Sequence, residues 1–365
     1  MSRNRKAEAM TAHILIVGGG INGLTSAWTL VRKGYRVSLF DQGPIPNPVA
    51  SSFDEHRITR HAYGPMQAYA QRMPRAFALW DQLFEDIGAR HFEPMPMIAF
   101  EREETGWIDP SLEDLRATGI GWRELDPAQF GAEHPLIRAE GITRAVAFSG
   151  SGMLFPSRIV TDLVVHLAAQ GVTFHPHTKV DEVDFETGRV TAGGVEHVGD
   201  HVIIAAGAWV NRLLPGTAGE LVPSRQTVVF LAPPPELAAL WAQAPIYLDL
   251  DAETGTYVLP PRPGTRLKIG DHRFSRTGDP DAPRIASEDE VADLIAAGHL
   301  AFTDFDRYTV LERKACYYTV TEDEHFVIRP AGKKTTLLSA CSGHGFKLAP
   351  QSAAEAVALV ERALS

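Results

Sequence analysis

Three glycines near the start of the chain have the spacing of a dinucleotide-binding loop. Gly18, Gly20 and Gly23 fit G-x-G-x-x-G, directly after the apolar run at residues 14–17 and before apolar residues at helical spacing. In such a loop the first glycine permits a tight turn and the second lets backbone approach a pyrophosphate. The third lets helix and strand pack closely. The pyrophosphate rests on the amide groups and the positive dipole end of the helix.

An acid stands where this motif requires one. Asp41 follows the second expected strand, residues 35–40. Its carboxylate can accept hydrogen bonds from ribose hydroxyls and would repel a 2′-phosphate, which favours FAD or NAD over NADP. FAD and NAD use the same loop, so this unit leaves the chemistry open.

Cationic side chains further along the chain could recognise a carboxylate. Arg57 and Arg60 are three residues apart, and they share a face if residues 57–63 begin a helix. Guanidinium groups pair bidentately with carboxylates. The alternative, a solvated basic helix start, is unfavourable against the helix dipole.

Two lysines and a cysteine each have a functional and a plain interpretation. Lys268 lies on an expected strand and would point to solvent by simple alternation. Lys347 follows a glycine-rich turn and could be an ordinary surface lysine. Cys316 could be a buried structural cysteine, and Cys341 is expected in the core.

Several segments together resemble a known family. It is the monomeric sarcosine oxidase and N-methyltryptophan oxidase family, flavin amine oxidases of the D-amino-acid-oxidase group, and the resemblance covers about residues 12–360. The segments are, in order, residues 14–23, 57–64 (RITRHAYG), 206–209 (AGAW), 267–272 (LKIGDH), 316–319 (CYYT), 323–326 (DEHF) and 342–347 (SGHGFK).

The resemblance implies roles for the polar residues. Arg60 and Lys347 would bind the substrate carboxylate, and Arg57 would lie beside the flavin ring. Lys268 would hold a water over the flavin and promote reaction with O2, because a cation stabilises superoxide. His272, Tyr257 and Tyr318 would line the substrate site, with His272 and Tyr318 among the catalytic residues.

The resemblance also implies FAD as the cofactor, with Cys316 forming a thioether to the flavin 8α-methyl group. That attack requires a thiolate favoured by nearby positive charge. The remaining cofactor contacts are expected at Gly18, Gly20, Ile21, Asn22, Gly23, Asp41, Gln42, Ser52, Arg57, Val180, Ala206, Gly207, Trp209, Gly343, His344, Gly345, Phe346 and Lys347.

The chain departs from the family pattern before Arg57. The family usually has a glycine and a flavin-adjacent histidine there, whereas this chain has Phe53 near the histidine's place. The turn at residues 260–266 is also unusually basic. Arg262 or Arg266 could meet a second substrate carboxylate, although a solvated turn explains them equally well.

The patterns predict an α/β fold, α+β overall, in which a Rossmann-like FAD-binding domain carries an inserted antiparallel-sheet substrate domain. The FAD-binding domain would comprise residues 12–90, 151–224 and 316–365. The substrate domain would comprise residues 91–150 and 225–315, with short strands and turns over 90–155. Residues 66–88 read as helical with a kink or break at Pro74, and the last helix as residues 351–364.

Composition limits the classes of function. The formal net charge of −10 argues against nucleic-acid binding. Two cysteines form no disulfide framework or zinc site, so a reducing compartment, the cytoplasm, is expected. Three consecutive glycines at 18–20 argue against a membrane span at 14–31, and residues 1–11 are expected to be a disordered leader.

The sequence therefore predicts a flavin oxidase of secondary amino acids such as sarcosine, other N-methyl amino acids or iminodiacetate. It would use O2, produce hydrogen peroxide and work as a monomer or weak oligomer. One alternative is a dehydrogenase that passes electrons to a protein or quinone. Another is a nucleotide-binding protein without redox turnover, which would be colourless when purified.

Overall fold

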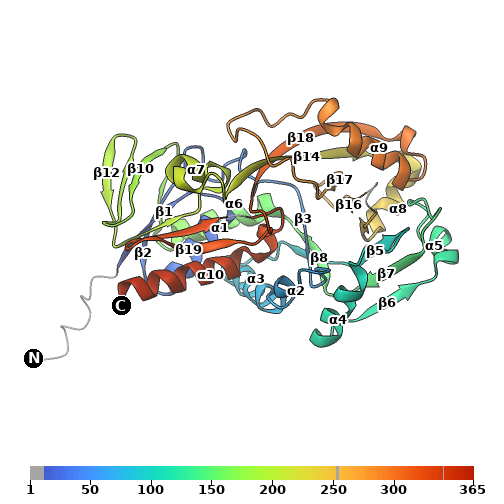
Figure 1. Ribbon diagram of the computed structural model, residues 1–365, viewed down its shortest axis with the longest axis horizontal. Helices are drawn as coiled ribbons and strands as arrows, with labels where there is room; N and C mark the ends of the chain where they lie inside the picture. The colour runs from blue at the N-terminus through green and yellow to red at the C-terminus, as the bar shows by residue number, and fades with distance from the viewer. Residues whose placement is uncertain (1–11, 252–254, 340) are drawn as a thin grey trace, which may run out of the picture.

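The computed structural model describes residues 12–251, 255–339 and 341–365. The predicted disordered leader, residues 1–11, lies outside the described residues. Within those ranges the predicted α/β class is confirmed, because one large sheet is mostly parallel and another mostly antiparallel. Figure 1 shows the first sheet and its helices on the left and the second sheet on the right.

The mostly parallel sheet has six strands, and only its β19–β20 pair is antiparallel. Their spatial order is β19 (Val327–Gly332), β20 (Thr335–Ser339), β13 (His201–Ile204), β1 (His13–Val17), β2 (Arg36–Phe40) and β9 (Thr173–His175).

Alternating side chains of β1 build both faces of this sheet. Ile14 and Ile16 pack into a core shared with helices, whereas Leu15 and Val17 pack into a core on the other face. The helices on the first face are α1 (Ile21–Arg32), α3 (Met73–Ile87), α6 (Pro156–Ala169) and α10 (Gly345–Leu364). The other face is covered by the antiparallel strands β10 (Val180–Asp184), β11 (Arg189–Ala192) and β12 (Val195–Val198), and by α7 (Val210–Leu213).

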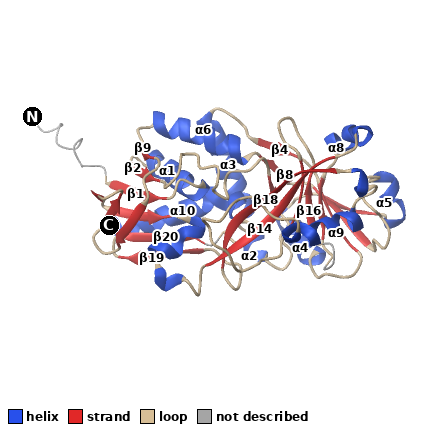
Figure 2. Ribbon diagram, turned by 90° about the horizontal axis from the view of Figure 1, so that it is seen from above, coloured by secondary structure: helices blue, strands red, loops and turns tan. Residues whose placement is uncertain are grey.

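The second sheet has eight strands, and only its β15–β5 pair is parallel. The order is β18 (Thr309–Val320), β14 (Val222–Ala232), β17 (Leu267–Asp271), β16 (Thr256–Leu259), β15 (Ile246–Asp249), β5 (Met97–Glu101), β7 (Arg144–Phe148) and β6 (Trp122–Leu125). One face is covered by α5 (Pro127–Glu133), α8 (Ala238–Gln243) and α9 (Ala292–Ala301), and the other packs partly on α4 (Ile108–Thr118). Figure 2 shows the molecule turned by 90°, with β14, β16 and β18 of this sheet labelled.

A small three-stranded sheet corrects the prediction for the two arginines. Residues Arg57–Arg60 form strand β3, not the start of a helix. Strand β3 pairs with β8 (Ser151–Leu154), which also pairs with β4 (Phe92–Pro94). Backbone pairing with a segment nearly a hundred residues away overrides the local pattern. Arg57 and Arg60 therefore do not share a helix face.

Other boundaries also differ from the sequence prediction. The break at Pro74 is confirmed, because α2 (Gln67–Ala70) ends before α3 begins with Pro74 in its first turn. Residues 90–155 were expected to hold strands and turns, yet they also contain α4 and α5. Helix α10 begins at Gly345 rather than at residue 351, so Lys347 lies in its first turn.

Two long strands join the halves of the molecule. Strands β14 and β18 contact η1 (Gly207–Trp209), which follows β13 of the six-stranded sheet. Each of them also runs across a predicted domain boundary, at 224/225 and 315/316 respectively. The exact segment bounds of the two domains stay a prediction.

Candidate active site

At two positions of the glycine loop, Gly18 and Gly23, the backbone leaves no room for a side chain. Gly18 has φ +110°, and a Cβ there would lie 2.3 Å from the carbonyl oxygen of Ala205. A Cβ on Gly23 would lie 1.9 Å from the carbonyl oxygen of Gly18. The loop therefore turns tightly from β1 into α1 and packs the helix closely on the strand.

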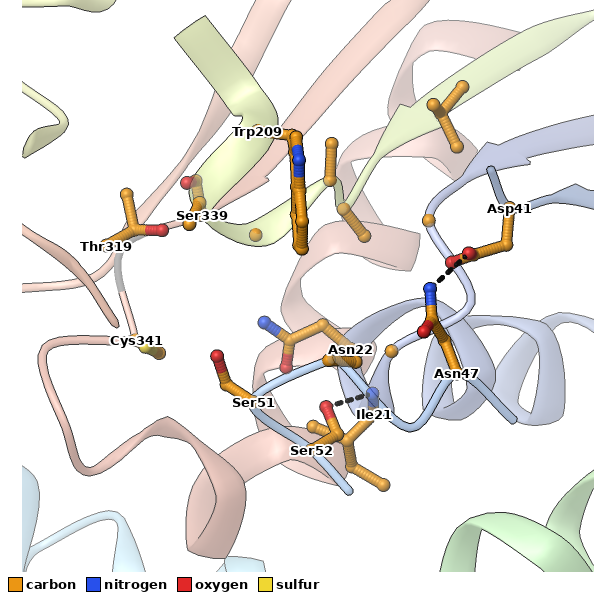
Figure 3. A pocket seen from close by; sticks show the side chains of 18 of the residues that line it. Ile21, Asn22, Asp41, Asn47, Ser51, Ser52, Trp209, Thr319, Ser339 and Cys341 are labelled. Carbon is orange, nitrogen blue, oxygen red and sulfur yellow. Dashed lines mark hydrogen bonds between the residues drawn. The ribbon is translucent and has the colours of Figure 1, made fainter. Parts of the chain in front are cut away.

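Asp41 anchors this loop to the next strand end. Its Oδ2 accepts a hydrogen bond from the Gly19 amide at 2.8 Å. Its Oδ1 accepts from the Gly43 amide at 2.8 Å and from Asn47 Nδ2 at 2.9 Å. The carboxylate lies on the wall of a large pocket (Figure 3), and its Oδ2 has one spare lone pair for a ribose.

This pocket, called the cofactor pocket here, runs from the glycine loop to the start of α10 (Figure 3). Most of the predicted cofactor residues line it. They are Gly18, Gly20, Ile21, Asn22, Asp41, Gln42, Ser52, Arg57, Val180, Ala206, Gly207, Trp209, Gly343, Gly345 and Phe346.

Four predicted cofactor residues do not line the cofactor pocket. Gly23 is used for packing beneath it, as described above. His344 and Lys347 line a neighbouring cavity instead, and Cys316 lines a small cavity that shares Arg57 with the cofactor pocket.

Sequence reasoning missed other residues of this wall. Cys341 was expected in the core, but it is only partly buried and lines the cofactor pocket (Figure 3). Asn47 was missed although its side chain binds Asp41. The further unpredicted lining residues include Ala50, Ser51, Thr178, Lys179, Ala208, Arg212, Leu213, Tyr317, Thr319, Leu338 and Ser339.

Unpartnered polar atoms show that the cofactor pocket suits a polar ligand. The side-chain oxygens of Asn22, Thr319 and Ser339 are buried without a hydrogen-bond partner among the described residues. Buried polar atoms normally have partners. Together with the glycine loop, the helix start and Asp41, they fit a dinucleotide such as FAD, whose ADP half these groups would hold.

A second cavity of about 800 Å³ adjoins the cofactor pocket, and Arg57, Tyr318, Gly343 and Phe346 line both. This substrate cavity is large enough for more than the smallest N-methyl amino acid. Every residue predicted for catalysis or substrate binding lines it: Arg57, Arg60, Tyr257, Lys268, His272, Tyr318 and Lys347.

Two basic side chains of the substrate cavity are buried close together. Arg60 and Lys347 both lie near the ring of Tyr63, with Arg60 Cζ at 5.4 Å and Lys347 Nζ at 5.1 Å from its centroid. Burial lowers the pKa of both groups, and Arg60 further lowers the pKa of Lys347. Neither has an ion-pair partner among the residues the structure describes. Such a pair is suited to an anionic ligand.

Lys268 does not point to solvent, because β17 is buried on both faces and the lysine is 0% exposed. Its Nζ donates to Asp54 Oδ2 at 2.9 Å and to the His56 carbonyl at 2.6 Å. Burial and the charges of Arg57 and Lys314 lower the pKa of Lys268, while Cys316 and Glu55 oppose them. The ammonium group is also paired with the Asp54 carboxylate. Arg57 is also paired with Asp54.

The aromatic wall of the substrate cavity is neutral. Burial raises the pKa of Tyr257 to about 12 and raises the pKa of Tyr318 well above its usual value. His272 is exposed and faces Glu324, with 3.3 Å between Nε2 and Oε2. Burial lowers the pKa of His344, so its imidazole is neutral at pH 7. The tyrosines can donate hydrogen bonds but cannot act as bases at neutral pH.

Cys316 is buried near three cations, Arg57, Lys268 and Lys314. Their charges favour the thiolate, but burial outweighs them and the pKa of Cys316 is raised. Arg313, the residue before Lys314, instead faces Glu288 with 2.6 Å between the charged atoms.

The basic turn does not reach the substrate cavity. Arg262 pairs with Glu93 at 2.6 Å, and Arg266 pairs with Glu312 at 2.6 Å. Neither arginine lines the substrate cavity, so the suggested contact with a second substrate carboxylate is not supported.

Among the helices of the described residues, none combines the length and the apolar character that a membrane span needs.

Comparison with known proteins agrees with this geometry. The profile of the family described as FAD dependent oxidoreductase, DAO, matches residues 13–359. Monomeric sarcosine oxidase from Bacillus sp. (strain B-0618) is 27% identical over 355 residues, covering 93% of this chain and 90% of that protein. N-methyl-L-tryptophan oxidase from Yersinia pestis (strain Pestoides F) is 25% identical over 353 residues, covering 93% and 92%.

Solved structures show the same fold. L-proline dehydrogenase from P. horikoshii has a TM-score of 0.82 at 18% identity, covering 96% of this chain and 94% of that chain. Fructosamine oxidase from Aspergillus fumigatus has a TM-score of 0.80 at 20% identity, covering 97% and 87%.

Proposed function

Because this chain belongs to the DAO family of FAD-dependent oxidoreductases, we propose that it oxidises secondary amino acids, with N-substituted glycines as the substrate class. The observation that carries this proposal is the cationic pair Arg60 and Lys347 in the substrate cavity next to the cofactor pocket. Relatives named for oxidation of sarcosine and N-methyl-L-tryptophan support the same class.

The proposed reaction follows from the arrangement of charges. Arg60 and Lys347 hold the substrate carboxylate, which orients the C–H bond next to the nitrogen. FAD, when bound, supplies a two-electron acceptor for the hydride. The resulting imine takes up water and yields an aldehyde and a primary amine. Reoxidation by O2 consumes two electrons and two protons and gives hydrogen peroxide.

No strong base is required of the protein when the amine binds unprotonated. Arg57, Arg60, Lys268 and Lys347 all line the substrate cavity. Positive charge on these groups would lower the pKa of a bound amine, because a like charge disfavours its protonated form. Tyr257 and Tyr318 are neutral at pH 7 because their pKa values are raised, which agrees with a reaction that needs no strong protein base.

Turnover with a panel of amines tests the proposal. We expect wild-type protein to convert N-methylglycine, larger N-alkyl amino acids or iminodiacetate to an aldehyde and hydrogen peroxide in equal amounts. Primary amino acids are the matched negative substrates. Release of aldehyde from none of the secondary amines would contradict the proposed function.

A dehydrogenase is the second candidate, favoured by one observation. The Asp54 carboxylate pairs with Lys268 and so weakens the positive charge available to stabilise superoxide. Lys268→Met separates the two candidates. For an oxidase we expect loss of O2 reactivity by at least about a hundredfold with nearly normal anaerobic flavin reduction. Unchanged O2 reactivity would contradict the oxidase.

We further propose that the flavin would be attached through Cys316, since that thiol lies in the small cavity that shares Arg57 with the cofactor pocket. Thioether formation would break the S–H bond and one C–H bond of the 8α-methyl group. Two protons would leave, and the two electrons would reduce the flavin until O2 accepts them. Acid precipitation is expected to leave yellow flavin in the wild-type pellet and to release it from Cys316→Ser. Cys341→Ser is the matched control and retains the yellow pellet. A colourless wild-type pellet would overturn the linkage.

We also propose a cytoplasmic monomer or weak oligomer. Both cysteines are free, as a reducing compartment would keep them. The name of the monomeric relative supports the oligomeric state.

A further inference from the structure

A buried carboxylate lies behind the substrate cavity, in the loop before β3. Asp54 is 5% exposed, and three basic side chains surround its carboxylate. It pairs with Arg57, with Lys268 at 2.9 Å and with Lys314 at 3.7 Å.

The three basic side chains line different cavities. Arg57 lines both the cofactor pocket and the substrate cavity, and Lys268 lines the substrate cavity. Lys314 instead lines the small cavity beside Cys316 and donates to the Phe53 carbonyl at 3.2 Å. Asp54 lines only that small cavity. Asp54 can therefore act on the reaction in two ways, by positioning Arg57 and Lys268 and by its charge acting through space.

We propose that Asp54 is a positioning residue that holds Arg57 and Lys268 beside the flavin and restrains the flavin's electron affinity. The inference rests on the proposed function, in which the flavin ring lies against these two cations. A reduced flavin and its sulfite adduct carry extra negative charge, which nearby positive charge stabilises. One buried carboxylate among three cations reduces that positive charge.

A purely structural role predicts a different result. If Asp54 only supported the loop, its removal would lower stability without a directed change in flavin properties. If it sets the local charge, its removal must favour negatively charged flavin species. Charges in a site shielded from water interact strongly enough for one lost carboxylate to change such an affinity about tenfold.

Sulfite binding by the FAD-loaded protein measures this property without turnover. We expect Asp54→Asn to lower the sulfite dissociation constant by about tenfold and to raise the flavin midpoint potential. Glu93→Gln is the matched control, because it removes one negative charge from a carboxylate that pairs with Arg262 rather than with the three cations. We expect this control to stay within about threefold of wild type.

Two further variants keep the inference testable if Asp54→Asn fails to fold. Lys314→Met removes one cation and is expected to weaken sulfite binding, and Asp54→Asn/Lys314→Met is expected to return toward wild type. Sulfite binding that is unchanged or weaker in Asp54→Asn would overturn the inference. So would unchanged or tighter binding in Lys314→Met.

The same preparations separate this inference from the proposed function. Reduction of the wild-type flavin by a secondary amino acid, together with unaltered sulfite binding in Asp54→Asn, rejects the role of Asp54 alone. A wild-type flavin that no secondary amine reduces rejects the proposed function, whatever the sulfite result.

Discussion

Lys347 shows how a binding residue can oppose stability. Its ammonium group is buried beside Arg60 in the first turn of α10 and has no acidic partner among the described residues. The start of a helix is already the positive end of its dipole, so this position is unfavourable for a cation. A substrate carboxylate would relieve these costs and thereby gain affinity.

Lys347→Met is expected to weaken substrate binding and to stabilise the protein without substrate. Loss of one partner from a buried charge pair costs about 2–5 kcal/mol, so KM is expected to rise at least about thirtyfold. Removal of the buried charge is expected to raise the unfolding free energy at pH 7 by about 1–2 kcal/mol. Substrate titration and thermal unfolding measure the two effects.

The stabilisation expected for Lys347→Met depends on pH, and its direction follows from the lowered pKa of Lys347. The folded-state pKa of Lys347 lies below its unfolded value, so the unfolded state binds more protons and wild-type stability rises with pH through this window. The gain in Lys347→Met should therefore shrink as pH approaches about 10.4, the ordinary lysine value. Lys333→Met, at an exposed lysine, is the control. A variant less stable than wild type at pH 7 would contradict the account.

Residue types at motif positions could be predicted from sequence, but their ionic partners could not. Lys268 and Lys347 were singled out by their neighbours in the chain. Asp54 was not, because its partners Lys268 and Lys314 lie more than two hundred residues away. Cys341 was assigned to the core because it lacks the motif context of Cys316, yet it lines the wall of the cofactor pocket.

Among the elements, β1 and α1 depend most directly on local sequence. Gly23 lies where the helix packs on the glycine loop, and a Cβ would overlap the Gly18 carbonyl oxygen. We expect Gly23→Ala to cost about 1–3 kcal/mol of stability and to weaken FAD binding at least about tenfold. Gly219→Ala is the control, since a Cβ there has no atom within 4 Å.

Thermal unfolding of the apoprotein and FAD titration check this prediction. Normal FAD affinity in Gly23→Ala would show that close packing at this point is not required.

Strand β3 could not be predicted from local sequence, because its partner β8 is remote in the chain and its four residues carry little periodicity.

At the scale of the whole molecule, the substrate cavity is formed by segments from both large sheets. Lys268 comes from β17 of the eight-stranded sheet, and Lys347 comes from α10 on the six-stranded sheet. The α/β class was predictable from the order of strand and helix patterns. The path of β14 and β18 across the predicted boundaries was not, because pairing between distant strands determines it.

The central claim is that this site passes electrons from a secondary amino acid to FAD. Anaerobic mixing of the FAD-loaded protein with N-methylglycine, larger N-alkyl amino acids and iminodiacetate tests it directly, with flavin absorbance as the readout. We predict rapid bleaching by at least one of these amines and none by the matched primary amino acids. A flavin that stays oxidised with every secondary amine, yet is reduced by a nicotinamide dinucleotide, would contradict the account.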